Sequence, residues 1–207
     1  MDLALSVKPA ISNKHGLILD IAICAIRRLA DGNRHMNRYD FSMFFDESFK
    51  VAREEKDGIS YNIDKLKTFH ENIYAMVEYY NFRDKVEEIK SILQNNRVII
   101  FNDEFDARQL LIQQCKNEGI DYQWVDELKI ECCKEKAESF YKPIKKLDLE
   151  TAVTLSRCEN TAPKLNVPEP EDFFCFPENY HTAFGDCIRI AFVFSVIKRS
   201  LMIRAAA

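Results

Sequence analysis

The sequence predicts an α/β domain in which a mixed sheet is flanked by helices. Short apolar runs rich in β-branched residues, at 16–26 and 97–101, alternate with longer segments of helical periodicity. Hydrophobic residues make up 47% of the 207 positions, which is enough for a core and too many for a disordered chain. With 5 Gly and 6 Pro, collagen-like and low-complexity classes are excluded. The length fits a single domain over 1–204, with a terminal tail at 205–207.

The N-terminal half contains two expected strands. Residues 16–26 (GLILDIAICAI) are apolar and β-branched, which predicts a buried strand. Residues 39–45 alternate in part and predict a second strand. Residues 46–70 are polar and include Gly58, so we expect mostly loop there.

The middle of the chain changes to helical periodicity. Residues 71–94 place Val86, Ile89 and Leu93 on one face, which predicts an amphipathic helix. The run RVIIF at 97–101 is typical of a buried parallel strand.

A second helix is expected at 105–117, with Gly119 as its stop signal. After it, 122–125 is compatible with a short strand. Charged helical patterns cover 127–141 and 147–157. Four prolines predict an extended loop at 158–180, and a long final helix is expected at 181–204.

Cysteine usage and hydropathy predict a cytoplasmic protein without a membrane span. The chain has 7 Cys, an odd number, and no CxxC pair, so we expect reduced thiols that act mainly as small core residues. No signal peptide is evident at the N-terminus. The longest apolar stretch, 187–197, is shorter than the ~20 residues of a membrane helix and is interrupted by Arg189.

Three short pieces carry candidate chemistry. Asn102–Asp106 (NDEFD) follows the strand at 97–101, where the carboxyl end of a buried strand opens onto the ligand crevice of α/β folds. His181–Asp186 (HTAFGD) begins the last helix, and its small residues Ala183 and Gly185 permit close approach of a ligand. Asp2 precedes the strand at 16–26.

Together these motifs resemble the DEDDh family of 3′–5′ exonucleases, which includes the proofreading subunit of bacterial DNA polymerase III, exonuclease X and RNase T. NDEFD matches the family's second motif and HTAFGD matches its third, in the correct order along nearly the whole chain. The resemblance implies an RNase H-like mixed β-sheet flanked by α-helices. The first motif departs from the pattern, because D-x-E would require a glutamate where this chain has Ala4.

The resemblance also implies a two-metal mechanism for hydrolysing phosphodiester bonds at DNA or RNA 3′ ends. Asp2, Asp106 and Asp186 would bind two divalent ions, Mg²⁺ or Mn²⁺, and His181 would be the general base. Ala4 cannot coordinate an ion, so activity of this form would be impaired. The expected partners are single-stranded DNA or RNA 3′ ends, with no membrane. The oligomeric state stays open, with a homodimer among the options.

Alternative interpretations exist for each feature. Taken alone, Asp106 is a typical helix N-cap, Asp186 a typical solvated helix residue, and His181 a typical surface residue of a first helical turn. Ala4 is compatible with a deliberate replacement, with a natural degenerate relative, or with a wrong alignment of Asp2. A catalytically inactive relative that binds nucleic acid or a protein partner is the alternative function, and an unrelated α/β protein is the third hypothesis.

Overall fold

The computed structural model shows a mixed β-sheet and the helices that cover it. The described residues are 1–9, 18–26, 38–43, 79–102, 106–142, 144, 147–161, 165, 167, 169–170 and 182–206. The general base expected at His181, part of the motif at 102–106, and residues 71–78 of the helix expected at 71–94 fall outside these ranges.

Within the described ranges, six strands form one mixed sheet in the order β4-β3-β2-β1-β5-β6. Their bounds are β1 Asp2–Pro9, β2 Ile18–Ile26, β3 Arg38–Met43, β4 Tyr79–Tyr80, β5 Arg97–Ile100 and β6 Lys129–Cys132. The first three strands are antiparallel neighbours, whereas β1, β5 and β6 run parallel to one another. The carboxyl ends of β1 and β5 therefore meet at the same edge of the sheet.

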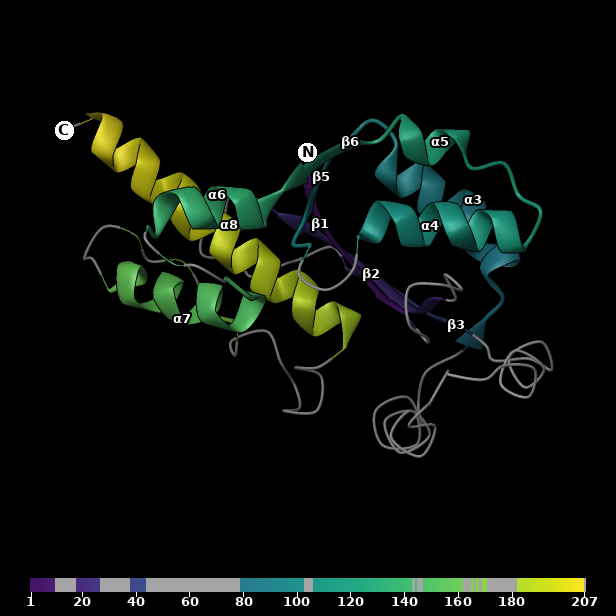
Figure 1. The fold of residues 1–207 in the computed structure, drawn as a ribbon, viewed down its shortest axis with the longest axis horizontal. Coiled ribbons are helices and arrows are strands. Elements are labelled where there is room, and N and C mark those ends of the chain that lie inside the picture. The colour runs from purple at the N-terminus through teal and green to yellow at the C-terminus, as the bar shows by residue number, and fades with distance from the viewer. Residues whose placement is uncertain are drawn as a thin grey trace.

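Helices cover both faces of this sheet (Figure 1). Their bounds are α3 Phe82–Leu93, α4 Ala107–Asn117, α5 Gln123–Asp126, α6 Cys133–Phe140, α7 Leu149–Asn160 and α8 Ala183–Ala206. Residues of α3, α4 and α5 form one hydrophobic core with the sheet, and residues of α6, α7 and α8 form a second core on the other face.

Strand β1 lies in the middle of the sheet and contributes to both cores. Leu3, Leu5 and Val7 belong to the core under α3 and α4, while Ala4 belongs to the core under α8. This division follows from the strand geometry, in which successive side chains point to opposite faces. The even-numbered residues of β1 therefore face α8.

Small side chains let α8 approach the sheet closely. Ala4, Ala22 and Cys24 are fully buried on the face that α8 covers. The Cys187 thiol of α8 lies 2.9 Å from the carbonyl oxygen of Ala22 and 3.5 Å from that of Ala4. A larger residue at any of these strand positions would have to push the helix away.

Three element predictions were wrong. Within the described part of the helix expected at 71–94, α3 begins only at Phe82, because Tyr79 and Tyr80 pair with β3 as the strand β4. The strand expected at 122–125 is the short helix α5, whose Trp124 and Val125 are buried. The helix expected at 127–141 begins with edge strand β6, because Ile130 lies in register with β5 before the chain turns into α6.

The described cysteines differ in exposure, which predicts a labelling pattern. Burial raises the pKa of the Cys115 thiol to about 11 and also raises the pKa of Cys133 and Cys187. Cys158, by contrast, is exposed. Since the thiolate is the reactive form, we expect iodoacetamide at pH 8 to alkylate Cys158 at least about 100-fold faster than these three buried thiols. Peptide mass spectrometry after timed quenching measures this ratio, and equal rates in the folded protein would contradict the core placement.

None of the helices described in the structure is long and apolar enough to cross a membrane.

Candidate functional site

A pocket of about 370 Å³ lies where β1 and β5 end. The second half of β1 and the residues after β5 form its floor, and the first turns of α7 and α8 contribute its other walls. Clefts at the carboxyl ends of parallel strands are where α/β folds bind ligands, and the volume is within the range of small-molecule sites, which begins at about 300 Å³. We call this the Asp186 pocket.

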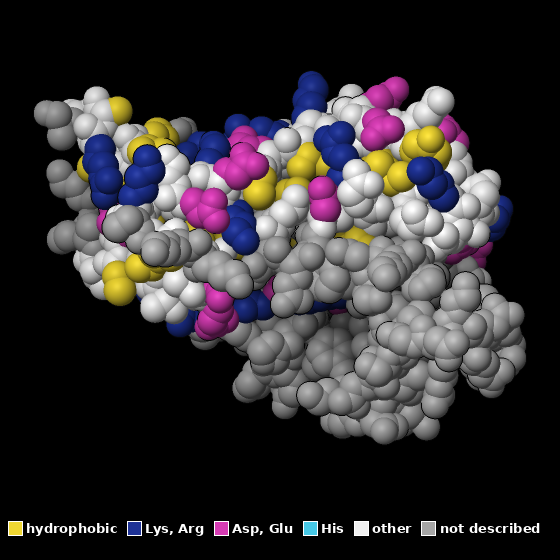
Figure 2. All heavy atoms as spheres, in the orientation of Figure 1, with side chains coloured by type: hydrophobic (Ala, Val, Ile, Leu, Met, Phe, Trp, Pro, Cys, Tyr) yellow, Lys and Arg dark blue, Asp and Glu magenta, His cyan; other side chains and the backbone are white. Residues whose placement is uncertain are grey.

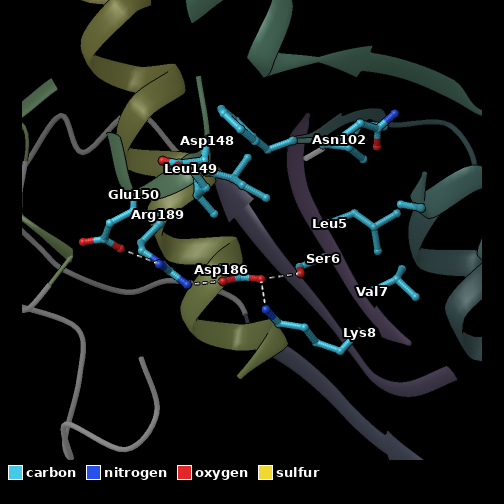
Figure 3. Close-up of a pocket in the computed structure, with 14 residues that line it drawn as sticks. Leu5, Ser6, Val7, Lys8, Asn102, Asp148, Leu149, Glu150, Asp186 and Arg189 are labelled. Carbon is cyan, nitrogen blue, oxygen red and sulfur yellow. Dashed lines mark hydrogen bonds and ion pairs between the residues drawn. The ribbon is translucent and has the colours of Figure 1, made fainter. Parts of the chain in front are cut away.

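The Asp186 carboxylate is held by two cations (Figure 3). The Lys8 ammonium contacts its Oδ2 atom and the Arg189 guanidinium contacts its Oδ1 atom. Ser6 donates a longer hydrogen bond, of 3.4 Å, to Oδ2. The charge that the last helix brings to the pocket is therefore neutralised by side chains of β1 and of α8 itself.

Arg189 also connects α8 to α7. Its Nη1 atom lies 3.0 Å from Oε2 of Glu150, a residue in the first turn of α7. The Arg189 side chain is 8% exposed, whereas that of Glu150 is 60% exposed. The guanidinium thus bridges a carboxylate inside the pocket and a carboxylate at its rim, which fixes its plane.

A second buried carboxylate lies next to Lys8. Asp20 of β2 is directly opposite Lys8 in the antiparallel register, so both side chains are on the α8 face. Asp20 is 2% exposed and accepts a 2.9 Å hydrogen bond from the backbone N–H of Ala183, in the first turn of α8. A carboxylate at a helix N-terminus satisfies unpaired N–H groups and interacts favourably with the helix dipole. Asp20 therefore ties the beginning of α8 to the sheet.

The rest of the pocket is mixed in character. Phe101, Leu149 and Ile190 provide apolar surface. Asn102 also lines the pocket, and its buried Oδ1 atom has no hydrogen-bond partner within the described residues. An unsatisfied buried acceptor is costly, so this oxygen is suited to accept an N–H or O–H donor from a bound molecule.

Asp2 lies at the opposite end of β1 from the pocket. Arg97 of β5 donates to both of its carboxylate oxygens, at 3.0 and 2.9 Å, and Lys198 of α8 lies 3.1 Å from Oδ2. Partial burial opposes ionisation of the Asp2 carboxyl, but the hydrogen bonds from Arg97 and Lys198 outweigh it and hold its pKa below the usual value. Asp2 is thus an ion-pair residue at the start of the strand.

Strand and helix geometry place Asp2 far from Asp186. Asp186 contacts Ser6, which is four residues beyond Asp2 on β1, or about 13 Å at the rise of a strand. Asp2 contacts Lys198, which is twelve residues beyond Asp186 on α8, or about 18 Å at the rise of a helix. The two carboxylates therefore cannot share a pair of ions about 4 Å apart.

Asp106 and Ala4 have structural roles, as a helix cap and as a core residue. Asp106 is the N-cap of α4 and accepts hydrogen bonds from the backbone N–H groups of Arg108, at 2.9 Å, and Gln109, at 3.4 Å. Ala4 is fully buried against α8, and a glutamate at this position would point into the core. His181 lies outside the described residues. Among the predicted catalytic and metal-binding residues that the structure describes, Asp186 lies in the pocket.

The residues assigned to the two divalent ions do not fit such ions. Asp2 is remote, Asp106 is a helix cap, and Asp186 is already bound to Lys8 and Arg189. The described ranges contain no group of three or more His, Cys, Asp or Glu side chains that could hold a metal. No step through Mg²⁺ or Mn²⁺ follows from this arrangement.

Sequence reasoning missed most of the residues that surround Asp186. Ser6, Lys8 and Asp20 come from two strands, and the register that brings them together is invisible in the sequence. One signal was available: Leu5-Ser6-Val7-Lys8 alternates apolar and polar residues, which is typical of a half-buried strand. Assigning that strand would have placed Ser6 and Lys8 on one face.

Comparison with known proteins found a similarity in fold and none in sequence. No family model matches the chain, and no curated protein matches it. A chain in the structure of the yeast NOT1 MIF4G domain co-crystallized with CAF1 matches with a TM-score of 0.54 and 12% identity. The match covers 97% of this chain and 80% of that chain.

These findings overturn the DEDDh assignment. The comparisons give no exonuclease family, and the structural match is to the NOT1 MIF4G–CAF1 structure. The same findings contradict the RNase H-like fold class that the resemblance implied. The resemblance rested on two short motifs, and the glutamate that its first motif requires is replaced by Ala4. Asp2 does not reach the pocket, and Ala4 is a core residue.

Proposed function

We propose that this chain is a non-catalytic nucleic-acid-binding protein whose Asp186 pocket receives the terminal nucleotide of a single strand. The observation that carries the proposal is the contact of Lys8 and Arg189 with Asp186. These cations contact the carboxylate oxygens that a metal ion would need. A pocket whose carboxylate is already paired in this way suits ligand binding better than metal-dependent hydrolysis.

The remaining groups suit a nucleotide. Apolar surface from Phe101, Leu149 and Ile190 can pack against a base, and the free Oδ1 atom of Asn102 can accept a hydrogen bond from an exocyclic amine or a ribose hydroxyl. Lys8 is 30% exposed and can reach a phosphate from its place beside Asp186.

The charge of the pocket limits how it can bind. Its lining contains three carboxylates, Asp148, Glu150 and Asp186, against two cations, Lys8 and Arg189. Phosphate attraction is therefore weak, and the base and sugar supply most of the affinity. We expect micromolar binding with a shallow salt dependence, close to the slope of about 0.7 that one phosphate contact gives in single strands.

The test is fluorescence anisotropy with ten-nucleotide DNA and RNA strands labelled at the 5′ end. We expect Asn102→Leu to weaken binding about fivefold to tenfold, because it removes one hydrogen bond to the ligand. Gln109→Leu is the matched control, since it removes an exposed amide on α4 that does not line the pocket. Both variants must show the same thermal unfolding midpoint within a few degrees.

Two outcomes would overturn the proposal. Equal affinities for wild type, Asn102→Leu and Gln109→Leu would show that the pocket is not the binding site. Release of 3′ nucleotides in Mg²⁺ or Mn²⁺ that is abolished by Asp186→Asn would show that the chain is an enzyme after all.

A further inference from the structure

A second concave surface lies at the far end of α8, away from the Asp186 pocket. It is a groove of about 320 Å³ beside α6, and we call it the α8 groove. Its lining is mostly apolar, with basic side chains at the rim; the residues that matter here are Arg97, Lys136, Phe194, Lys198, Leu201 and Met202. Figure 2 shows hydrophobic and basic side chains gathered at this end of the molecule.

The apolar wall of the groove is exposed in the described structure. Leu201 is 50% exposed and Met202 is 51% exposed, although large hydrophobic side chains on a helix normally pack inward. Ile203, which follows them and does not line the groove, is 37% exposed. A methionine is flexible and polarisable, so Met202 can adapt to different apolar partners.

Three cations surround one aromatic ring at the base of the groove. Arg97, Lys136 and Lys198 lie 5.5, 5.6 and 5.5 Å from the centre of the Phe194 ring. Phe194 itself is 3% exposed, so its ring faces are covered. The ring positions the cations and cannot stack on a base.

The rim of the groove carries an excess of positive charge. Asp2 pairs with Arg97 and Lys198, and Glu131 pairs with Arg97 and Lys136, which leaves two carboxylates for three cations. Neither Asp2 nor Glu131 lines the groove, and no other carboxylate does so among the described residues. A bound molecule therefore meets cations and apolar surface.

The apolar wall and the positively charged rim together indicate what the α8 groove binds. We propose that the α8 groove binds an acidic amphipathic segment of a partner protein, whose apolar residues pack on Leu201 and Met202 and whose carboxylates contact Lys136 and Lys198. A helix with apolar residues one turn apart matches an apolar groove of this kind, and carboxylates on its flank complement the rim. This site is independent of the Asp186 pocket.

Two other occupants fit less well. A second copy that docks groove to groove brings the same cations face to face, because a twofold interface pairs identical surfaces. A nucleic acid would meet the cations, but it would also have to cover the apolar wall without an accessible aromatic ring to stack on. The acidic segment satisfies both the apolar wall and the charge.

The experiment is selection of binders from a phage-displayed library of random 16-residue peptides on the full chain. We expect the enriched peptides to combine Asp or Glu with Leu, Ile, Phe or Met at helical spacing. Synthetic versions of them should lose at least tenfold in affinity on Leu201→Asp and on Lys136→Glu, measured by isothermal titration calorimetry.

The matched control is Ile203→Asp, which makes the same kind of change on the same helix outside the groove and should leave peptide affinity within twofold of wild type. Circular dichroism confirms that each variant is folded. The proposal is overturned if no peptide is enriched, if the enriched peptides are basic, or if Leu201→Asp and Ile203→Asp weaken binding equally. It is also overturned if Leu201→Asp instead abolishes self-association or binding to an RNA strand.

Discussion

Replacing Ala4 by glutamate should strongly destabilise the protein. Ala4 is fully buried between the sheet and α8, with the Cys187 thiol 3.5 Å from its carbonyl oxygen. A glutamate here adds volume to a packed core and buries a carboxylate without a partner, and each of these changes is strongly destabilising. We expect a loss of more than about 4 kcal/mol in the free energy of unfolding, a large fraction of the roughly 5–15 kcal/mol that stabilises an ordinary domain.

Urea denaturation followed by circular dichroism measures this loss. Ala206→Glu is the matched control, because it makes the same substitution at an exposed position near the end of α8 and should change the free energy of unfolding by less than about 0.5 kcal/mol. A stable Ala4→Glu protein with Mn²⁺-dependent nuclease activity would contradict both the prediction and the correction of the exonuclease assignment.

Removal of the Asp20 carboxylate should have the second largest effect. Asp20 is 2% exposed, accepts a hydrogen bond from the backbone N–H of Ala183, and lies opposite Lys8 in the sheet. Asp20→Ala leaves this buried N–H without its acceptor and removes the carboxylate opposite Lys8 in the strand register. We expect a loss of about 2 to 3 kcal/mol in the free energy of unfolding, the cost of leaving a buried group unpaired after removal of a charged hydrogen-bond partner.

Two variants give this prediction its controls. Asp106→Ala removes an exposed N-cap from α4 and should cost about 1 kcal/mol, as helix caps usually do. Asp20→Asn keeps an acceptor oxygen for Ala183, so it should lose less than Asp20→Ala. If urea denaturation gives equal losses for Asp20→Ala and Asp106→Ala, the burial of Asp20 has no energetic role.

The strongly patterned elements were predictable because their signals are local. The apolar run of β5, the strand within 16–26, and the amphipathic face of α3 with Val86, Ile89 and Leu93 are all present in the structure. The elements that failed have weak local signals. Strand β6 is short, lies at the sheet edge and contains charged residues, so it resembled the helix that follows it.

The site was less predictable than the fold elements. Asp186 was selected from its motif as a metal ligand, but its observed partners, Lys8 and Arg189, were not predicted, because Lys8 comes from a distant part of the chain. Ser6 and Asp186, for example, are 180 residues apart in the sequence. Asp106 illustrates the opposite case, since its simplest local interpretation, a helix N-cap, is what the structure contains.

By itself, the sequence determined which segments are apolar enough to be buried and which periodicity each one follows, as in β5 and α3. Only the tertiary structure decided which charges meet. The register of β1 with β2 places Lys8 opposite Asp20, and the packing of α8 on that face brings Asp186 and Arg189 to Lys8. Burial depends on the local pattern of side chains, whereas charge pairing depends on strand register and helix placement, which are set by contacts between distant segments.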